Sequence, residues 1–155
     1  MSCWLGVDLG NARVGLAKSD PELTFAHPIG NVQVWGNDYF HVLDDVLDVI
    51  EDEDIAHVVV GHPLQLNGAE GKSAKKARRW AGALERRIAE EGIAVTVELL
   101  DERLTTVDAH RQLREAGLST REHRPSIDQQ SAVVLLQEAL DRNARERAGT
   151  AVMEV

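Results

Sequence analysis

The chain of 155 residues contains a single cysteine, Cys3, which excludes an internal disulfide and fits a reducing compartment. Apolar runs long enough to span a membrane are absent, and the first residues lack the basic and then apolar segments of a signal peptide. We therefore expect a cytoplasmic protein. Internal repeats, low-complexity stretches and linkers are also absent, so we expect one domain over residues 1–148 and a frayed tail over residues 149–155.

Two further features are missing. The six histidines show no paired spacing of the kind that zinc sites use, which argues against a zinc site. The chain also lacks an excess of positive charge. Its net charge of −9 argues against a protein that simply coats nucleic acid.

That average charge hides two segments of opposite sign. Residues 44–54 contain seven acids and no base, whereas residues 72–87 contain seven bases and only one acid, Glu85. For a polyanionic ligand the local charge matters more than the total. The basic segment is therefore either a solvated helix face or a contact surface for a nucleic-acid backbone. The candidates for such contact are Lys72, Lys75, Lys76, Arg78 and Arg79, with Arg121 and Arg124 further along the chain.

Hydrophobic periodicity predicts a hairpin and a third strand, followed by alternating helices and strands. The predicted strands cover residues 3–8, 14–19, part of 25–34, 55–61 and 93–100, and the predicted helices cover residues 38–52, 70–91, 106–116 and 126–147. This order is typical of a mixed sheet with helices on its faces.

Three acidic residues lie at the ends of these predicted elements. Asp8 ends the first strand, Glu102 follows the strand that ends at Leu100, and Asp128 begins the last helix. Carboxylates that meet at element ends are suited to a divalent ion such as Mg²⁺, which takes oxygen ligands and is commonly held together with substrate phosphates. The pattern therefore indicates an enzyme that cleaves phosphodiester bonds.

Asp8, Asp128 and Arg103 also have simpler explanations. Asp8 could cap the turn after its strand, and Asp128 could interact with the helix dipole, which contributes about 0.3–1 kcal/mol. The position of Asp128 on the same helix face as Ala132 and Leu135 favours a functional role, because an unpaired charge facing the core is costly. Arg103 could be only a structural partner of Asp101.

Four motifs follow one another along the chain. They are Asp8-Leu9-Gly10 with Arg13 and Gly15, Gly61-His62-Pro63-Leu64 with Asn67-Gly68 and Glu70-Gly71, Asp101-Glu102-Arg103-Leu104-Thr105-Thr106, and the segment from Asp128 to Gln137. With these motifs the chain resembles the YqgF/RuvX family of pre-16S rRNA nucleases, which are also described as Holliday-junction-resolvase-like proteins. The resemblance covers about residues 4–141.

The resemblance implies an RNase H-like α/β fold, in which a three-stranded antiparallel meander joins parallel strands in a mixed five-stranded sheet flanked by helices. It implies a hydrolase whose catalytic triad, Asp8, Glu102 and Asp128, holds Mg²⁺ or Mn²⁺. It implies structured nucleic acid as the substrate, either the 5′ end of pre-16S rRNA or branched Holliday-junction DNA. Arg13 and Arg103 join the basic residues named above as expected substrate contacts.

Other functions fit parts of the pattern. A ribosome-maturation factor that binds nucleic acid without catalysis would keep the acids as structural remnants. Actin-like ATPases and sugar kinases also begin with an Asp-x-Gly motif, but such kinases need a second lobe, for which 155 residues leave no room. A homodimer is a further expectation, and the candidates for its interface are Trp35, Tyr39, Phe40 and Trp80.

Overall fold

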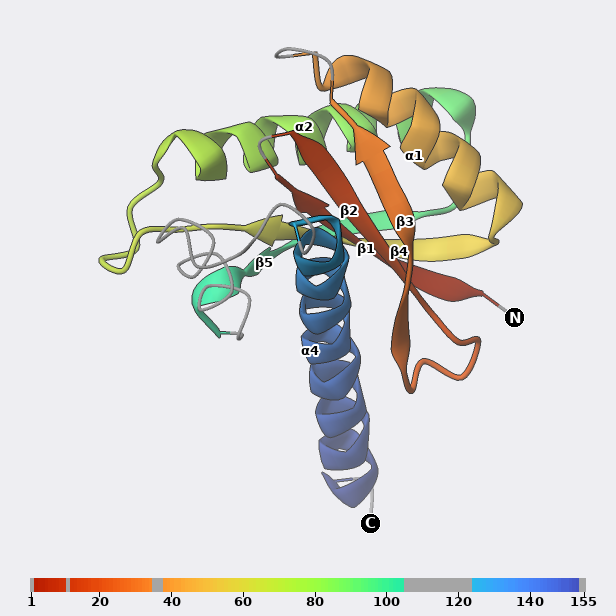
Figure 1. Ribbon diagram of the computed structural model, residues 1–155. Coiled ribbons are helices and arrows are strands. Elements are labelled where there is room, and N and C mark those ends of the chain that lie inside the picture. Colours follow the sequence, from red (N-terminus) through yellow and green to blue (C-terminus); the bar gives the residue numbers. More distant parts are fainter. Residues whose placement is uncertain (1, 11, 35–37, 105–123, 154–155) are drawn as a thin grey trace.

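The structure is a computed structural model that describes residues 2–10, 12–34, 38–104 and 124–153 (Figure 1). The side chains of residues 40, 104, 124–129 and 150–153 lie outside this description. The elements in chain order are β1 (Cys3–Leu9), β2 (Arg13–Ser19), β3 (Ala26–Gln33), α1 (Phe40–Asp52), β4 (Ile55–His62), α2 (Lys72–Glu91), β5 (Thr96–Asp101), the short 3-10 helix η1 (Glu102–Leu104) and α4 (Arg124–Met153).

The five strands form one sheet in the order β3-β2-β1-β4-β5. β1 pairs with β2, and β2 with β3, in antiparallel fashion, whereas β1–β4 and β4–β5 are parallel pairs. The predicted mixed sheet of an antiparallel meander and parallel strands is therefore confirmed. Because β1, β4 and β5 run in the same direction, their carboxyl ends meet at one edge of the sheet, where α/β proteins commonly bind ligands.

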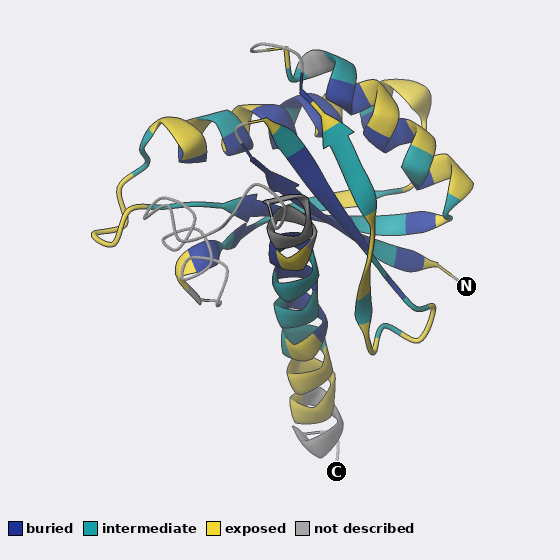
Figure 2. Cartoon of the chain, in the orientation of Figure 1, coloured by how far each residue is buried: buried dark blue, intermediate teal, exposed yellow. Residues whose placement is uncertain are grey.

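Helices cover both faces of the sheet (Figure 1). α1 and α2 enclose the larger apolar core with side chains such as Leu5, Val7 and Leu84. α4 crosses the opposite face and encloses a second, smaller core that includes Val59, Leu100 and Leu135. The buried positions follow this arrangement, since they line the strands and the inner sides of the helices (Figure 2). Among the helices of the described ranges, none combines the length and apolar character needed to cross a membrane.

The element boundaries differ from the predictions at several points. The helix predicted from residue 70 begins at Lys72, because Gly71 is still extended, and it ends as predicted at Gly92, which is left-handed with φ 67°. The strand predicted from residue 93 begins only at Thr96. α4 continues to Met153, beyond the predicted end at 147. A helical glycine such as Gly149 costs only about 1 kcal/mol relative to alanine. The helix predicted at 106–116 lies outside the described residues.

Candidate active site

Asp8 lies at the carboxyl end of β1, opposite Gly15 on β2, and its exposed fraction is 1%. Side chains alternate along a strand, so Asp8 shares a face with Gly6. A Cβ atom placed on Gly6 would lie 2.9 Å from Leu136 Cβ and 3.0 Å from the Ala132 carbonyl oxygen. The face that carries Asp8 is therefore the face on which α4 packs directly against the β1 backbone.

Glu102 lies immediately after β5 and is also 1% exposed. Its carboxylate lies over Gly61 on the neighbouring strand β4, and the carboxyl carbon would be 3.2 Å from a Cβ atom on Gly61. Leu135 Cδ2 on α4 lies 3.4 Å from that same point. Glycine at position 61 therefore leaves the space that the Glu102 carboxylate occupies beneath α4.

Asp128 lies on α4, one helical turn before Ala132 and about two turns before Leu135. Ala132 lies over Gly6 of β1, and Leu135 lies near Gly61 of β4. The side chain of Asp128 lies outside the description. Within the described ranges, no three acidic, histidine or cysteine side chains form a group that could hold a metal ion.

Asp101 is adjacent to Glu102 but is bound to Arg103. The Arg103 Nη2–Asp101 Oδ2 distance is 2.6 Å, and Arg103 Nε is 3.0 Å from both carboxylate oxygens. These hydrogen bonds hold the pKa of Asp101 below its ordinary value. Arg103 Nη1 also donates to the Leu66 carbonyl oxygen at 3.3 Å, which ties the β4–α2 loop to the end of β5. Arg103 therefore has a structural partner, and its contact with substrate stays a prediction.

His62 is the last residue of β4 and contacts Glu70 in the following loop. The His62 Nε2–Glu70 Oε2 distance is 2.8 Å, and Arg78 Nε lies 3.0 Å from the same oxygen. The hydrogen bond with His62, and next that with Arg78, hold the pKa of Glu70 below its ordinary value. Glu70 has no predicted role from the sequence, although its place in the second motif is a signal. It anchors the loop beside the sheet edge to α2.

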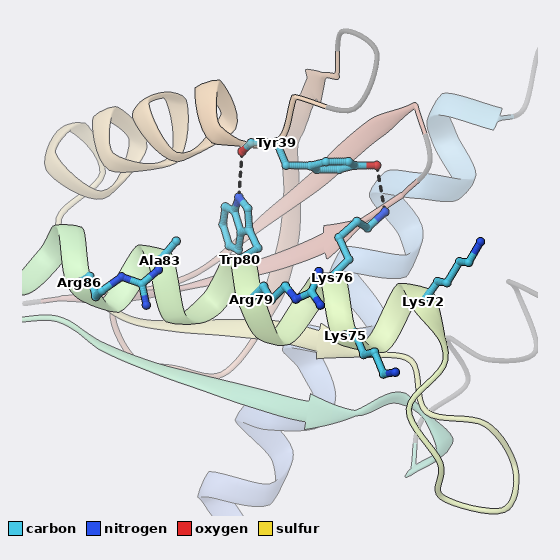
Figure 3. A pocket seen from close by; sticks show the side chains of 8 residues that line it. All are labelled: Tyr39, Lys72, Lys75, Lys76, Arg79, Trp80, Ala83 and Arg86. Atoms are coloured by element: carbon cyan, nitrogen blue, oxygen red, sulfur yellow. Dashed lines mark hydrogen bonds between the residues drawn. The ribbon is translucent and has the colours of Figure 1, made fainter.

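Four of the predicted basic residues line a cavity of about 650 Å³ along α2, which we name the α2 pocket (Figure 3). Its lining residues are Tyr39, Lys72, Lys75, Lys76, Arg79, Trp80, Ala83 and Arg86. Arg78 does not line it. Arg13 lies elsewhere, half-buried on β2. Arg121 lies outside the described residues, and Arg124 is the first residue of α4 with its side chain outside the description.

Tyr39 connects the α2 pocket to the turn after Asp8. Its hydroxyl donates to the Gly10 carbonyl oxygen at 3.0 Å and accepts from Lys76 Nζ at 2.9 Å. Trp80 Nε1 donates to the Tyr39 carbonyl oxygen at 3.2 Å, as Figure 3 shows. From the sequence, Tyr39 and Trp80 are only interface candidates. No local motif marked Tyr39 as a link between distant elements.

Comparison with known proteins agrees with this arrangement. The structure superposes on RuvC of Thermus thermophilus, solved in complex with a Holliday junction substrate, with a TM-score of 0.57 over 93% of this chain and 96% of that chain. The sequences are 17% identical, so this likeness concerns the fold. The fold is that of the RNase H-like resolvases, as the sequence predicted.

The sequence comparisons identify the family more specifically than the fold does. The family model described as "RuvX: Holliday junction resolvase" matches residues 2–142, and the chain belongs to this family. A relative from Bifidobacterium longum subsp. infantis is 65% identical, covering 90% of this chain and 97% of the relative. One from Nocardioides sp. is 42% identical, covering 88% and 86%. Both carry the name "Putative pre-16S rRNA nuclease". The predicted family is therefore confirmed, and a nuclease is its functional class.

Proposed function

We propose that the protein is an endonuclease that depends on Mg²⁺ or Mn²⁺ and hydrolyses phosphodiester bonds in structured nucleic acid. Its substrate would be the 5′ end of pre-16S rRNA, in keeping with the names of its relatives, or a branched Holliday-junction DNA. The observation that carries the proposal is the burial of two carboxylates, Asp8 and Glu102, at the carboxyl ends of β1 and β5.

The residues at this edge fit a divalent ion. Carboxylate oxygens are the ligands that Mg²⁺ prefers. Burying two such groups at 1% exposure is costly for their charged forms unless a cation or hydrogen bonds compensate. Gly61 leaves room for the Glu102 carboxylate, where any larger residue would displace it. Asp8 and Glu102, with Asp128 of α4, would hold the ion, which when bound can activate a water molecule and stabilise the leaving oxygen.

The remaining residues would bind and orient the substrate. Lys72, Lys75, Lys76 and Arg79 supply positive charge along α2, beginning where the β4–α2 loop leaves the sheet edge. Phosphate contacts of this kind position a nucleic acid without reading its sequence. Arg13, Arg103, Arg121 and Arg124 complete the proposed set of contacts. The Asp101–Arg103 pair would hold the loop around Leu66 in place beside Glu102.

Cleavage of a substrate panel tests this function. The panel contains a pre-16S rRNA 5′ end, a four-way DNA junction and a plain duplex, each assayed with Mg²⁺, with Mn²⁺ and with EDTA. We expect metal-dependent cleavage of a structured substrate that Asp8→Asn abolishes. Asp48→Asn, an exposed acid on α1, is the control and should retain full activity. Tight binding of the panel without cleavage would instead support a non-catalytic ribosome-maturation factor.

Two further expectations belong to the same proposal. We expect a cytoplasmic location because the single cysteine, Cys3, is buried and forms no disulfide. A homodimer stays a prediction that analytical ultracentrifugation tests. Trp80 is a weak candidate for its interface, because its exposed fraction is only 4% within a single chain.

A further inference from the structure

The cations of α2 fall into two groups that differ in their partners. Arg78 pairs with Glu70 at 3.0 Å and Arg87 with Asp44 at 2.9 Å. Among the described residues, no ion pair neutralises the pocket-lining cations Lys72, Lys75, Arg79 and Arg86. The chain has 26 acids and 17 Lys and Arg residues, so a shortage of acids does not explain the difference. Unneutralised positive charge is concentrated in the α2 pocket.

This concentration is unfavourable in the free protein. Lys75, Lys76 and Arg79 lie three, four and seven residues after Lys72, so the four share one face of the helix. Like charges at such spacings destabilise a helix. An anionic ligand would remove this repulsion. Arg86 lies 14 residues after Lys72, so the row of cations is about 21 Å long at 1.5 Å per residue. A ligand that covers this row would be an extended polyanion.

The walls of the α2 pocket are not only cationic. The partly exposed Tyr39 contributes aromatic surface between the charged side chains, whereas Trp80 and Ala83, which are 4% and 7% exposed, contribute only small apolar areas (Figure 3). A duplex presents its phosphates outward and needs only a row of cations. An unpaired strand also presents bases and sugars, and proteins bind it by combining a basic groove with aromatic surfaces. The composition of the pocket therefore favours a single strand.

The α2 pocket is also connected to the candidate active site. Lys72 begins α2 directly after the loop that leaves β4, and the Arg103 side chain holds that loop beside Glu102. Tyr39 joins Lys76 to the turn that follows Asp8. A strand that lies in the pocket can therefore reach the edge of the sheet where the acids lie.

We propose that the α2 pocket binds a single-stranded segment of nucleic acid next to the cleaved bond, with phosphates on its cationic rim and bases or sugars against the partly exposed Tyr39. This assignment rests on the nuclease activity proposed above and specifies its substrate: a structured nucleic acid with an unpaired flank.

The test is a binding measurement in EDTA, so that it does not depend on catalysis. The probes are labelled single-stranded RNA and DNA of about 12 nucleotides, within the 4–16 that single-strand-binding domains occupy, and a duplex of equal length. The test variant is Lys75→Gln/Arg79→Gln. The control is Arg87→Gln/Arg145→Gln, which removes the same charge outside the pocket, where each arginine is paired with an acid.

We expect the wild-type protein to bind the single strands more tightly than the duplex. The test variant should raise the Kd for the single strand about tenfold and make the slope of log K against log salt shallower by about 1.4, since two phosphate contacts are lost. The control variant should change both by much less. Equal losses in the two variants, equal binding of the duplex, or no single-strand binding by the wild type would each overturn the proposal.

Discussion

The carboxylate of Glu102 occupies the space that a side chain on Gly61 would need. Gly61 lies opposite Leu100 in the β4–β5 register, and Glu102 follows two residues later, where the chain turns back over β4. A glycine in one strand thus determines where the acid from the next strand lies.

Gly61→Ala should therefore remove activity while leaving the fold intact. The added methyl would push Glu102 from its position, and displacing a functional group by about 1 Å costs on the order of 100-fold in rate. The free energy of unfolding should fall by about 1–3 kcal/mol through overpacking. Steady-state cleavage and urea unfolding measure the two effects. Gly82→Ala on α2, where the nearest atom is Arg86 Nη1 at 3.8 Å, is the control and should lose neither. Full activity of Gly61→Ala would contradict the placement of Glu102.

Gly6→Ala should weaken the docking of α4. The new Cβ would lie 2.9 Å from Leu136 Cβ and 3.0 Å from the Ala132 carbonyl oxygen, and a backbone atom cannot move away as a side chain can. We expect a loss of about 1–3 kcal/mol in the free energy of unfolding, measured with urea. Gly149 of α4 has open space around it, so Gly149→Ala is the control and should raise the free energy of unfolding by up to about 1 kcal/mol. Unchanged stability of Gly6→Ala would show that α4 does not pack this closely on β1.

Asp101 and Arg103 should act as one unit. We expect Asp101→Asn and Arg103→Gln each to reduce cleavage by releasing the loop around Leu66, and the double variant to be little worse than either single one. Coupling energies between contacting residues are about 0.5–3 kcal/mol. A double-mutant cycle on kcat/KM measures this term. Additive effects would indicate instead that Arg103 contacts the substrate independently of Asp101.

Glu98 should make stability depend on pH. It lies on β5 and bonds to His57 Nε2 at 2.9 Å and to Arg142 Nη2 of α4 at 2.8 Å. Burial raises the pKa of Glu98, but these two partners outweigh burial and hold the pKa below its ordinary value of 4.5. A depressed pKa stabilises the fold at pH values above 4.5, and this contribution disappears as the pH falls through the folded-state pKa.

Glu98→Gln should accordingly lower the free energy of unfolding at pH 7 by about 1.5 kcal/mol, the lower end for a hydrogen bond to a charged group. The difference from wild type should shrink as the pH is lowered below 4.5. Urea unfolding across this range measures it, with Glu90→Gln, an exposed acid on α2, as the control. A difference that stays constant with pH would assign the effect to packing instead of charge.

The sequence predicted the sheet well because its signals are local. The valine-rich run of β4, the hairpin of β1 and β2, and Gly92 at the end of α2 each report on their own segment. Proline suits an edge strand or a bulge, and β3, which contains Pro28, is the edge strand with a register shift beside that residue. The predicted end of α4 at residue 147 was wrong, because a glycine such as Gly149 weakens a helix without having to end it.

Relations between segments could not be predicted in the same way. Asp8 and Glu102 could each be predicted locally, because each is an acid that follows an apolar run. The function of Gly61 depends on the register between β4 and β5, which no short segment encodes. The link from Tyr39 to Gly10 and Lys76 joins three elements, and it becomes visible only when α2 lies against the end of β1. The Asp101–Arg103 pair was easier to anticipate, because its partners are two residues apart.

Calorimetry with Mn²⁺ tests most directly the central claim that three acids form one metal-dependent centre. The wild-type protein should bind Mn²⁺ at millimolar or lower concentration, and Asp8→Asn, Glu102→Gln and Asp128→Ala should each abolish that binding while the far-UV circular dichroism stays unchanged. No binding by the wild type at millimolar Mn²⁺, or unchanged binding in all three variants, would contradict the claim.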